Sequence, residues 1–343
     1  PSVEFALYDS QEAAFQALAE GDLDYVLNPD PLPRDLRVQM KENETIRTYT
    51  NPDYNMFYLA FNMNRPPMSE NAFREVFDIL IDQEFINAEV LADAVYPLHS
   101  TMHPENTYWY NPDVTDPYAD MTRAERIDLA VTVLKEAGWS WESEPRWDEF
   151  AQDVIPGVGL TMPDEEPMPT VTILGPDASH DPIRATYNLW IAEWARQLGM
   201  PVESRLAGRN TIVDSVFVAS DYDMYLYGWR MGNKAFPADY YEAYWHSRNC
   251  TVDTGYYNTT CFNSEQFDAL VEELMVTDDL ARAQELVYEM QDILADQRPL
   301  IPLFSGKVHD FAHQHVIFPY TDVLGGIESQ SGFQAEAQVL TEK

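Results

Sequence analysis

The clearest pattern of apolar and polar positions lies in the first quarter of the chain, where a strand-like run precedes an amphipathic helix. Residues 58–61 form a short, bulky run of apolar side chains, which predicts a buried strand. Pro66 and Pro67 end it, because neither has a backbone N–H to donate to a ladder. Ser69 stands where an N-cap belongs. Apolar residues then recur at helical spacing over residues 73–86, which predicts a helix with one face in the core.

Similar periods continue to the end of the chain. Apolar runs predict strands at residues 3–8, 23–28, 171–175, 200–207, 222–229 and 300–304. Helical periods predict helices at residues 11–21, 123–137, 182–198, 212–219, 264–275 and 280–297. The alternation of strand, helix and strand indicates an α/β fold.

Size and charge narrow the class of protein. At 343 residues the chain exceeds one ordinary compact domain and suits two lobes, and no run approaches the roughly 18 apolar residues of a membrane span. Its 21 basic and 58 acidic residues give a net charge of −37. A field of this sign repels polyanions, so no nucleic-acid partner is expected. Adaptation to salt or heat and a merely solvated acidic surface explain this charge equally well.

Two cysteines, Cys250 and Cys261, flank the loop TVDTGYYNTT. A disulfide across so short a loop is geometrically plausible and suits an oxidising compartment, and two buried free thiols are the alternative. His309, His313 and His315 are the best candidates for a metal cluster, because His309 and His313 have the spacing of one helical face. No helix pattern accompanies them, so neither a metal site nor a cofactor is expected.

Five blocks of the chain resemble a known family. Residues 51–86 are similar to a stretch written roughly YLxFNxxxPPFxDxxVRxAxxxAIDRxxI in the dipeptide/oligopeptide/nickel family (family 5) of extracytoplasmic solute-binding proteins of ABC importers. Four further blocks are similar to the family, at residues 14–26, 123–139, 225–247 and 262–304, and all five stand in the family's order. The ordered set covers most of the chain and is far more specific than any single block.

The resemblance implies a two-lobed, periplasmic-binding-protein-like (type II) α/β fold, with mixed sheets flanked by helices. The earliest family block begins near residue 17 and the chain starts with Pro1, so we expect the first lobe to be incomplete. Residues 1–55 would be the remainder of the first lobe, residues 56–298 the second, ligand-binding lobe, and residues 299–343 the return into the first lobe.

In the family the solute lies in a closed cleft between the lobes, lined partly by a Gly-Trp strand and the loop after it. The resemblance therefore implies a solute site at Tyr227, Trp229, Arg230, Asn233, Phe236 and Asp239. Trp229 would stack on an apolar or ring-shaped face of the solute, and Arg230 would pair with a carboxylate. Core packing of Trp229 and an ion pair of Arg230 are the alternatives.

The sequence departs from the peptide-binding members at one position. There an aspartate shortly after the Gly-Trp pair receives the α-ammonium of the peptide, whereas here Gly232 and Asn233 occupy that neighbourhood and no acid follows until Asp239. This leaves room for an oligosaccharide, an amino-acid derivative or another small polar solute, unless Asp239 folds inward. Tyr54 and Asn55, near the junction of the lobes, complete the set of candidates.

The function that the resemblance implies is the extracytoplasmic solute-binding component of an ABC importer. It would close over a peptide or other small polar solute and deliver it to the permease subunits, as a monomer without catalysis. The location would be the periplasm or the cell surface, and any lipid anchor would lie upstream of Pro1. A secreted glycoside hydrolase, whose clefts use the abundant Trp, Tyr, Asp and Glu, and a sugar-binding sensor are the alternatives.

Overall fold

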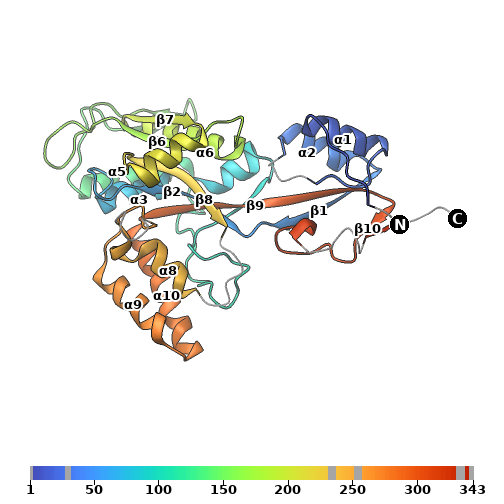
Figure 1. Ribbon diagram of the computed structural model, residues 1–343. Coiled ribbons are helices and arrows are strands. Elements are labelled where there is room, and N and C mark those ends of the chain that lie inside the picture. The colour runs from blue at the N-terminus through green and yellow to red at the C-terminus, as the bar shows by residue number, and fades with distance from the viewer. Residues whose placement is uncertain (1–2, 28–31, 231–236, 251–256, 330–336, 340–343) are drawn as a thin grey trace. The chain divides into compact units, whose positions relative to one another are not determined.

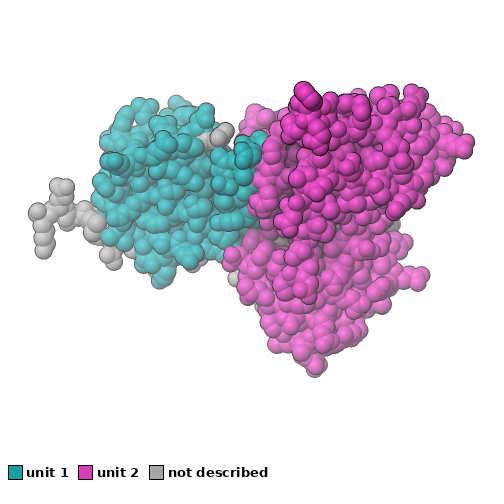
Figure 2. Space-filling model, turned by 180° about the vertical axis from the view of Figure 1, so that it is seen from behind, with its two compact units in different colours: residues 1–55, 87–96, 305–343 teal, residues 56–86, 97–304 magenta. Residues whose placement is uncertain are grey.

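The computed structural model describes residues 3–27, 32–230, 237–250, 257–329 and 337–339. The chain divides into two compact units, coloured separately in Figure 2. Unit 1 comprises residues 1–55, 87–96 and 305–343, and unit 2 comprises residues 56–86 and 97–304. That these units correspond to the two predicted lobes stays a prediction.

Unit 2 is built on a mixed sheet with the strand order β9-β2-β8-β6-β7 (Figure 1). Its strands are β2 (Asn55–Phe61), β6 (Val171–Pro176), β7 (Val202–Ala207), β8 (Met224–Arg230) and the first residues of β9 (Leu300–His313). β6 runs parallel to β7 and to β8, with Ile173 opposite Ser204 and Met224, and β2 is antiparallel to β9. The predicted α/β fold class is therefore confirmed.

Several helices of unit 2 begin at a side chain that caps their first turn. The helices of this unit are α3 (Asn71–Leu80), α4 (Gln83–Phe85), α5 (Arg123–Glu136), α6 (Pro182–Gln197), α7 (Arg209–Val213), α8 (Ala238–Trp245), α9 (Glu265–Val276) and α10 (Leu280–Gln297). Thr122 and Glu125 form a capping box at the start of α5. Asp181 caps α6, which has a proline in its first turn. The hairpin of β4 (Arg146–Asp148) and β5 (Asp153–Ile155) forms a separate small sheet.

The segment after β2 differs from its prediction. α3 begins after Glu70 rather than after Ser69, and it ends at Leu80. The side chain of Asp82 then accepts a hydrogen bond from the Phe85 N–H and starts α4. A single helix over this segment is therefore a wrong prediction, because the apolar period continues across a break that a local cap creates.

Unit 1 is smaller. It contains α1 (Gln11–Glu20), α2 (Arg34–Glu42), β1 (Ile46–Pro52), most of β3 (Val95–Pro97), the rest of β9, and the pair β10 (Val316–Ile317) and β11 (Gln338–Val339). β1 is antiparallel to β9, from Ile46 opposite His313 to Pro52 opposite Lys307. Gly21 ends α1 as predicted, with φ at +85°, a conformation that a residue without Cβ adopts at little cost.

Two strands predicted near the N-terminus are wrong. Residues 3–8 form no strand, and Phe5 and Leu7 are 70% and 100% exposed. In residues 23–27 only a single bridge, from Tyr25 to Ala312, remains. Apolar character favours a strand, but a strand also needs a partner for its backbone, and the described residues offer none to 3–8.

In the described ranges, every helix is too short or too polar to cross a membrane.

Candidate functional site

Strand β8 sets the positions of Tyr227 and Trp229. The two residues lie on the same face of the unit 2 sheet, because side chains two residues apart in a strand point the same way. Gly228 lies between them, and a Cβ there would be 2.2 Å from Cδ1 of Phe57 and 2.9 Å from the carbonyl oxygen of Met56. The glycine of the Gly-Trp pair is therefore required by the close approach of β2.

Trp229 lies in a cluster of aromatic rings. Tyr244 stacks on it with ring centroids 4.2 Å apart, and Tyr58 lies 4.6 Å away at an angle of 50°. Tyr240 and Trp245 meet it edge-on at 6.1 and 6.0 Å. These contacts favour packing by the indole faces over stacking on a solute. The buried indole Nε1 has no hydrogen-bond acceptor in the described part of the chain, whereas buried donors usually have one.

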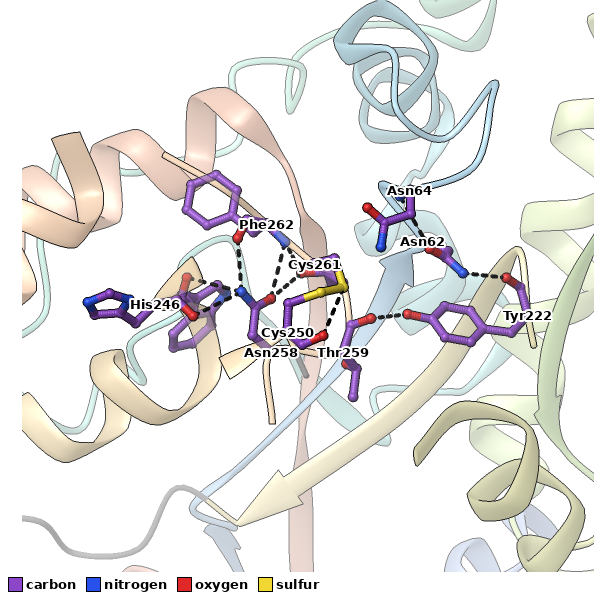
Figure 3. The surroundings of a disulfide bond; sticks show 11 residues. Asn62, Asn64, Tyr222, His246, Cys250, Asn258, Thr259, Cys261 and Phe262 are labelled. Atoms are coloured by element: carbon purple, nitrogen blue, oxygen red, sulfur yellow. Dashed lines mark hydrogen bonds between the residues drawn. A yellow bond between two sulfur atoms is a disulfide. The ribbon is translucent and has the colours of Figure 1, made fainter. Parts of the chain in front are cut away.

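A disulfide closes the loop after α8, the helix that carries most of these rings. Cys250 and Cys261 are bonded, with Cα atoms 4.9 Å apart, so the predicted disulfide is confirmed (Figure 3). It joins the segment that follows α8 to the segment that precedes α9. The loop residues 251–256 lie outside the described residues.

Asn258, drawn beside the disulfide in Figure 3, holds the end of α8. Its Nδ2 donates to the carbonyls of Trp245 and His246, at 3.2 Å each, and to that of Phe262 at 2.9 Å. The last carbonyls of a helix lack partners within the helix, so Asn258 serves as a C-cap supplied from a distance. Through α8 it supports the rings around Trp229.

Tyr227 contacts an arginine that the sequence reasoning missed. The guanidinium carbon of Arg184 lies 5.9 Å from the ring centroid of Tyr227 and 5.1 Å from that of Phe57. Arg184 stands in the first turn of α6, and its Nε donates to Oδ2 of Asp181 at 2.7 Å. The one signal in the sequence is its place just after β6, because ligands of parallel sheets bind at the carboxyl ends of the strands.

The other candidates near β8 are less fully placed. Arg230 ends β8, but its side chain lies outside the described part of the chain, as do Asn233 and Phe236 entirely. Asp239 is exposed in the first turn of α8. The structure thus brings Tyr227 and Trp229 together, and Asp239 stands on the helix that packs against Trp229.

Tyr54 and Asn55 belong to unit 1. Tyr54 is half-buried in the bend between β1 and β2. Asn55 is 7% exposed; its Oδ1 accepts from the Gly306 N–H at 2.8 Å, and its Nδ2 donates to Oδ2 of Asp53 at 2.5 Å. These bonds tie the bend to β9 and indicate a structural role for the Asn55 amide.

The histidine cluster has a different setting from a metal site. His309 and His313 lie on strand β9, not on a helix. Nδ1 of His309 is 3.0 Å from Oγ1 of Thr50, and burial lowers the pKa of the imidazole to about 3. Among the residues that the structure describes, no three His, Cys, Asp or Glu side chains are grouped so as to hold a metal ion.

Comparison with protein families identifies one that covers most of the chain. A model described as bacterial extracellular solute-binding proteins, family 5 Middle, matches residues 1–251. The periplasmic murein peptide-binding protein MppA of Escherichia coli (strain K12) is 20% identical over 305 residues, which are 88% of this chain and 49% of MppA. The chain spans about half the length of the curated relatives that it matches.

Solved structures agree with this match. The oligopeptide-binding protein AppA from Bacillus subtilis, in complex with a nonapeptide, superposes on this chain with a TM-score of 0.71 at 15% identity. The match covers 96% of this chain and 58% of the AppA chain. NikZ from Campylobacter jejuni, in complex with Ni(L-His), gives 0.66 at 18% identity, with 95% and 59% covered. These likenesses confirm the periplasmic-binding-protein-like fold. None of the proteins named here supports the glycoside hydrolase alternative.

Proposed function

The chain belongs to family 5 of the bacterial extracellular solute-binding proteins, and from this premise we propose that it is part of the solute-binding component of an ABC importer. The protein binds a peptide or another small polar solute outside the cytoplasm and delivers it to the permease subunits. It binds without catalysis, as a monomer. The single observation that carries the proposal is the family match over residues 1–251.

The geometry of unit 2 supports a solute site at the carboxyl ends of β6 and β8. Ligands of parallel sheets occupy this edge, and here Tyr227 and Trp229 stand at it on one face. We retain Arg230, Asn233, Phe236 and Asp239 as further members of the site, with Tyr54 and Asn55 at the bend that leads into β2. The named relatives bind a murein peptide, a nonapeptide and a nickel–histidine complex, which supports a peptide or a comparably small polar solute.

A thermal-shift screen of the whole protein tests the proposal. One set of samples contains pooled short peptides and the other contains oligosaccharides. A ligand at about 100 times its Kd stabilises the folded state by roughly 2.7 kcal/mol. This stabilisation raises the midpoint of thermal unfolding by a readily measured amount. Stabilisation that Tyr227→Ala abolishes supports the proposed site. Consumption of a sugar during the assay contradicts a protein that only binds.

A further inference from the structure

The sequence contains three Asn-x-Thr triplets in which x is not proline. They begin at Asn43 (Asn-Glu-Thr), Asn249 (Asn-Cys-Thr) and Asn258 (Asn-Thr-Thr). This triplet is the acceptor for N-linked glycosylation of secreted proteins, and the sugar-bearing side chain must lie at the surface. Resting on the extracytoplasmic location proposed above, we propose that Asn43 is a glycosylation site and that the fold excludes the other two.

Asn43 lies in a turn whose hydrogen bonds hold its amide in one orientation. It follows the last residue of α2, and its Oδ1 accepts from the Thr45 N–H at 2.9 Å and from the Thr45 hydroxyl at 2.8 Å. A backbone N–H can only donate, so Oδ1 faces the turn and Nδ2 points away from it. The triplet is folded as an Asx turn, with the threonine hydroxyl bonded to the amide that would be modified.

The space beside Nδ2 of Asn43 is open. The side chain is half-buried, and no residue in the described ranges accepts a hydrogen bond from Nδ2. Asn43 borders a hollow along the exposed face of α2, which Asp35, Val38, Gln39 and Glu42 also line. A bulky, hydrated sugar chain needs such a surface beside its attachment point.

The two other triplets lack this freedom. Asn249 is 6% exposed, and its Nδ2 donates to the carbonyl oxygen and to Oε1 of Glu242 at 2.7 and 3.1 Å. Asn258 is fully buried, and its Nδ2 donates to the three carbonyls described above. A sugar on either Nδ2 would remove one of its two N–H donors and would have to occupy the packed interior. Among the three triplets, the fold therefore accommodates a sugar at Asn43 alone.

The transfer needs a donor and an enzyme that the cell supplies. The donor is a lipid-linked oligosaccharide, in which the anomeric carbon of the first sugar is bonded to a phosphate oxygen. Nδ2 loses one proton to a base of the transferase and forms a bond to that carbon. The carbon–oxygen bond breaks, and its electron pair leaves with the lipid phosphate. The product is a neutral amide, so Oδ1 of Asn43 can keep both hydrogen bonds to Thr45.

Peptide mass spectrometry of the whole protein, purified from the cells that naturally produce it, tests the assignment. Trypsin cuts after Lys41 and Arg47, so Asn43 lies in the peptide of residues 42–47. The other two triplets fall together in the peptide of residues 249–282, which serves as the control in the same digest. We expect the mass of peptide 42–47 to rise by a whole number of sugar residues, with fragmentation locating them on Asn43. Peptide 249–282, once its disulfide is reduced, should have its unmodified mass.

Two variants of Thr45, produced in the same cells, test whether the triplet is the acceptor. Thr45→Ala removes the hydroxyl and should abolish the modification, whereas Thr45→Ser keeps a hydroxyl and should retain it. Sugar that persists in Thr45→Ala overturns the proposal. A wild-type peptide 42–47 without sugar, or sugar on Asn249 or Asn258, overturns it as well. Each of these results leaves the solute-binding function standing, because Asn43 is not a member of the proposed solute site.

Discussion

Two arginines of unit 2 occupy partly or fully buried places and use opposite ends of the guanidinium. Arg126 on α5 is 1% exposed, and its Nη1 and Nη2 donate to the carbonyls of Ile79 and Tyr118 at 2.8 Å each. Its Nε alone has no acceptor among the described residues. Arg184 uses Nε, and both of its Nη groups remain without a described acceptor.

The difference separates an arginine that holds the scaffold from an arginine at the edge of the proposed solute site. Nη donors that meet backbone carbonyls tie α3, α5 and the loop between them into one block. The Nη donors of Arg184 have no acceptor among the described residues, so they do not tie a second element to α6.

The largest effect should follow from replacing Arg126. Arg126→Met leaves the carbonyls of Ile79 and Tyr118 buried without a donor, and Asp116 without the cation 3.7 Å away. We expect the free energy of unfolding to fall by about 3–5 kcal/mol, measured by urea denaturation.

Arg282→Gln is the control for this comparison. Arg282 lies on α10 and pairs with Glu273 and Glu285 at the surface, so its loss should leave the urea midpoint unchanged. If Arg126→Met loses no more stability than Arg282→Gln, then Arg126 does not stabilise the packing of α3 against α5.

A pH titration tests the scaffold in another way. His103 is 3% exposed, its Nδ1 accepts from the Glu105 N–H at 3.1 Å, and burial lowers the pKa of the imidazole to about 4. Because the unfolded chain then takes up a proton more readily than the folded one, this stability is complete above about pH 6.5 and is lost as the pH falls toward 4. The wild type should lose up to about 3 kcal/mol more than His103→Gln over this range. Parallel stability curves would contradict a buried neutral histidine.

A single methyl group added at residue 228 should lower the free energy of unfolding. Gly228→Ala places a Cβ against Phe57, and we expect it to cost about 1–3 kcal/mol in urea unfolding. In a chain that already carries Phe57→Ala, Gly228→Ala should cost less than it does in the wild type, because the ring is gone and only the contact with the Met56 carbonyl oxygen remains. Additive losses in the double variant would mean that the two residues are not in contact.

The smallest effect on stability should come from replacing Arg184, which stands at the carboxyl edge of the sheet. In Arg184→Gln, Asp181 keeps its bond to the backbone N–H of residue 184 and stays at the positive end of α6. We expect the free energy of unfolding to fall by about 1 kcal/mol, well below the loss in Arg126→Met. A loss as large as that of Arg126→Met would assign Arg184 to the scaffold.

Local signals in the sequence located most of the fold, whereas the site depends on contacts between distant segments. The helical periods predicted α5 and α6 almost to their observed ends, and the glycine at residue 21 gave the end of α1, because each signal acts within its own helix. The Gly-Trp strand indicated Tyr227 and Trp229 through resemblance. Arg184 was missed because it meets Tyr227 only once α6 packs on the sheet, an arrangement that no local period contains.

The same reasoning explains the strand predicted at residues 3–8. Its apolar residues satisfy the local condition for a strand, but pairing depends on a second segment, and no described residue provides it. The length of β9 was also underestimated. Leu300 to Phe304 reads as one short apolar run, yet the strand continues to His313 because β1 pairs with its polar second half.

Hydrogen exchange of the whole protein, with and without the pooled tripeptides, tests the central claim most directly. If the carboxyl edge of β6 and β8 binds the solute, amides within residues 181–187 and 224–230 should gain protection, while those of α3 and α5 stay unchanged. Protection confined to other segments, with no change in β8 and the start of α6, would contradict the account.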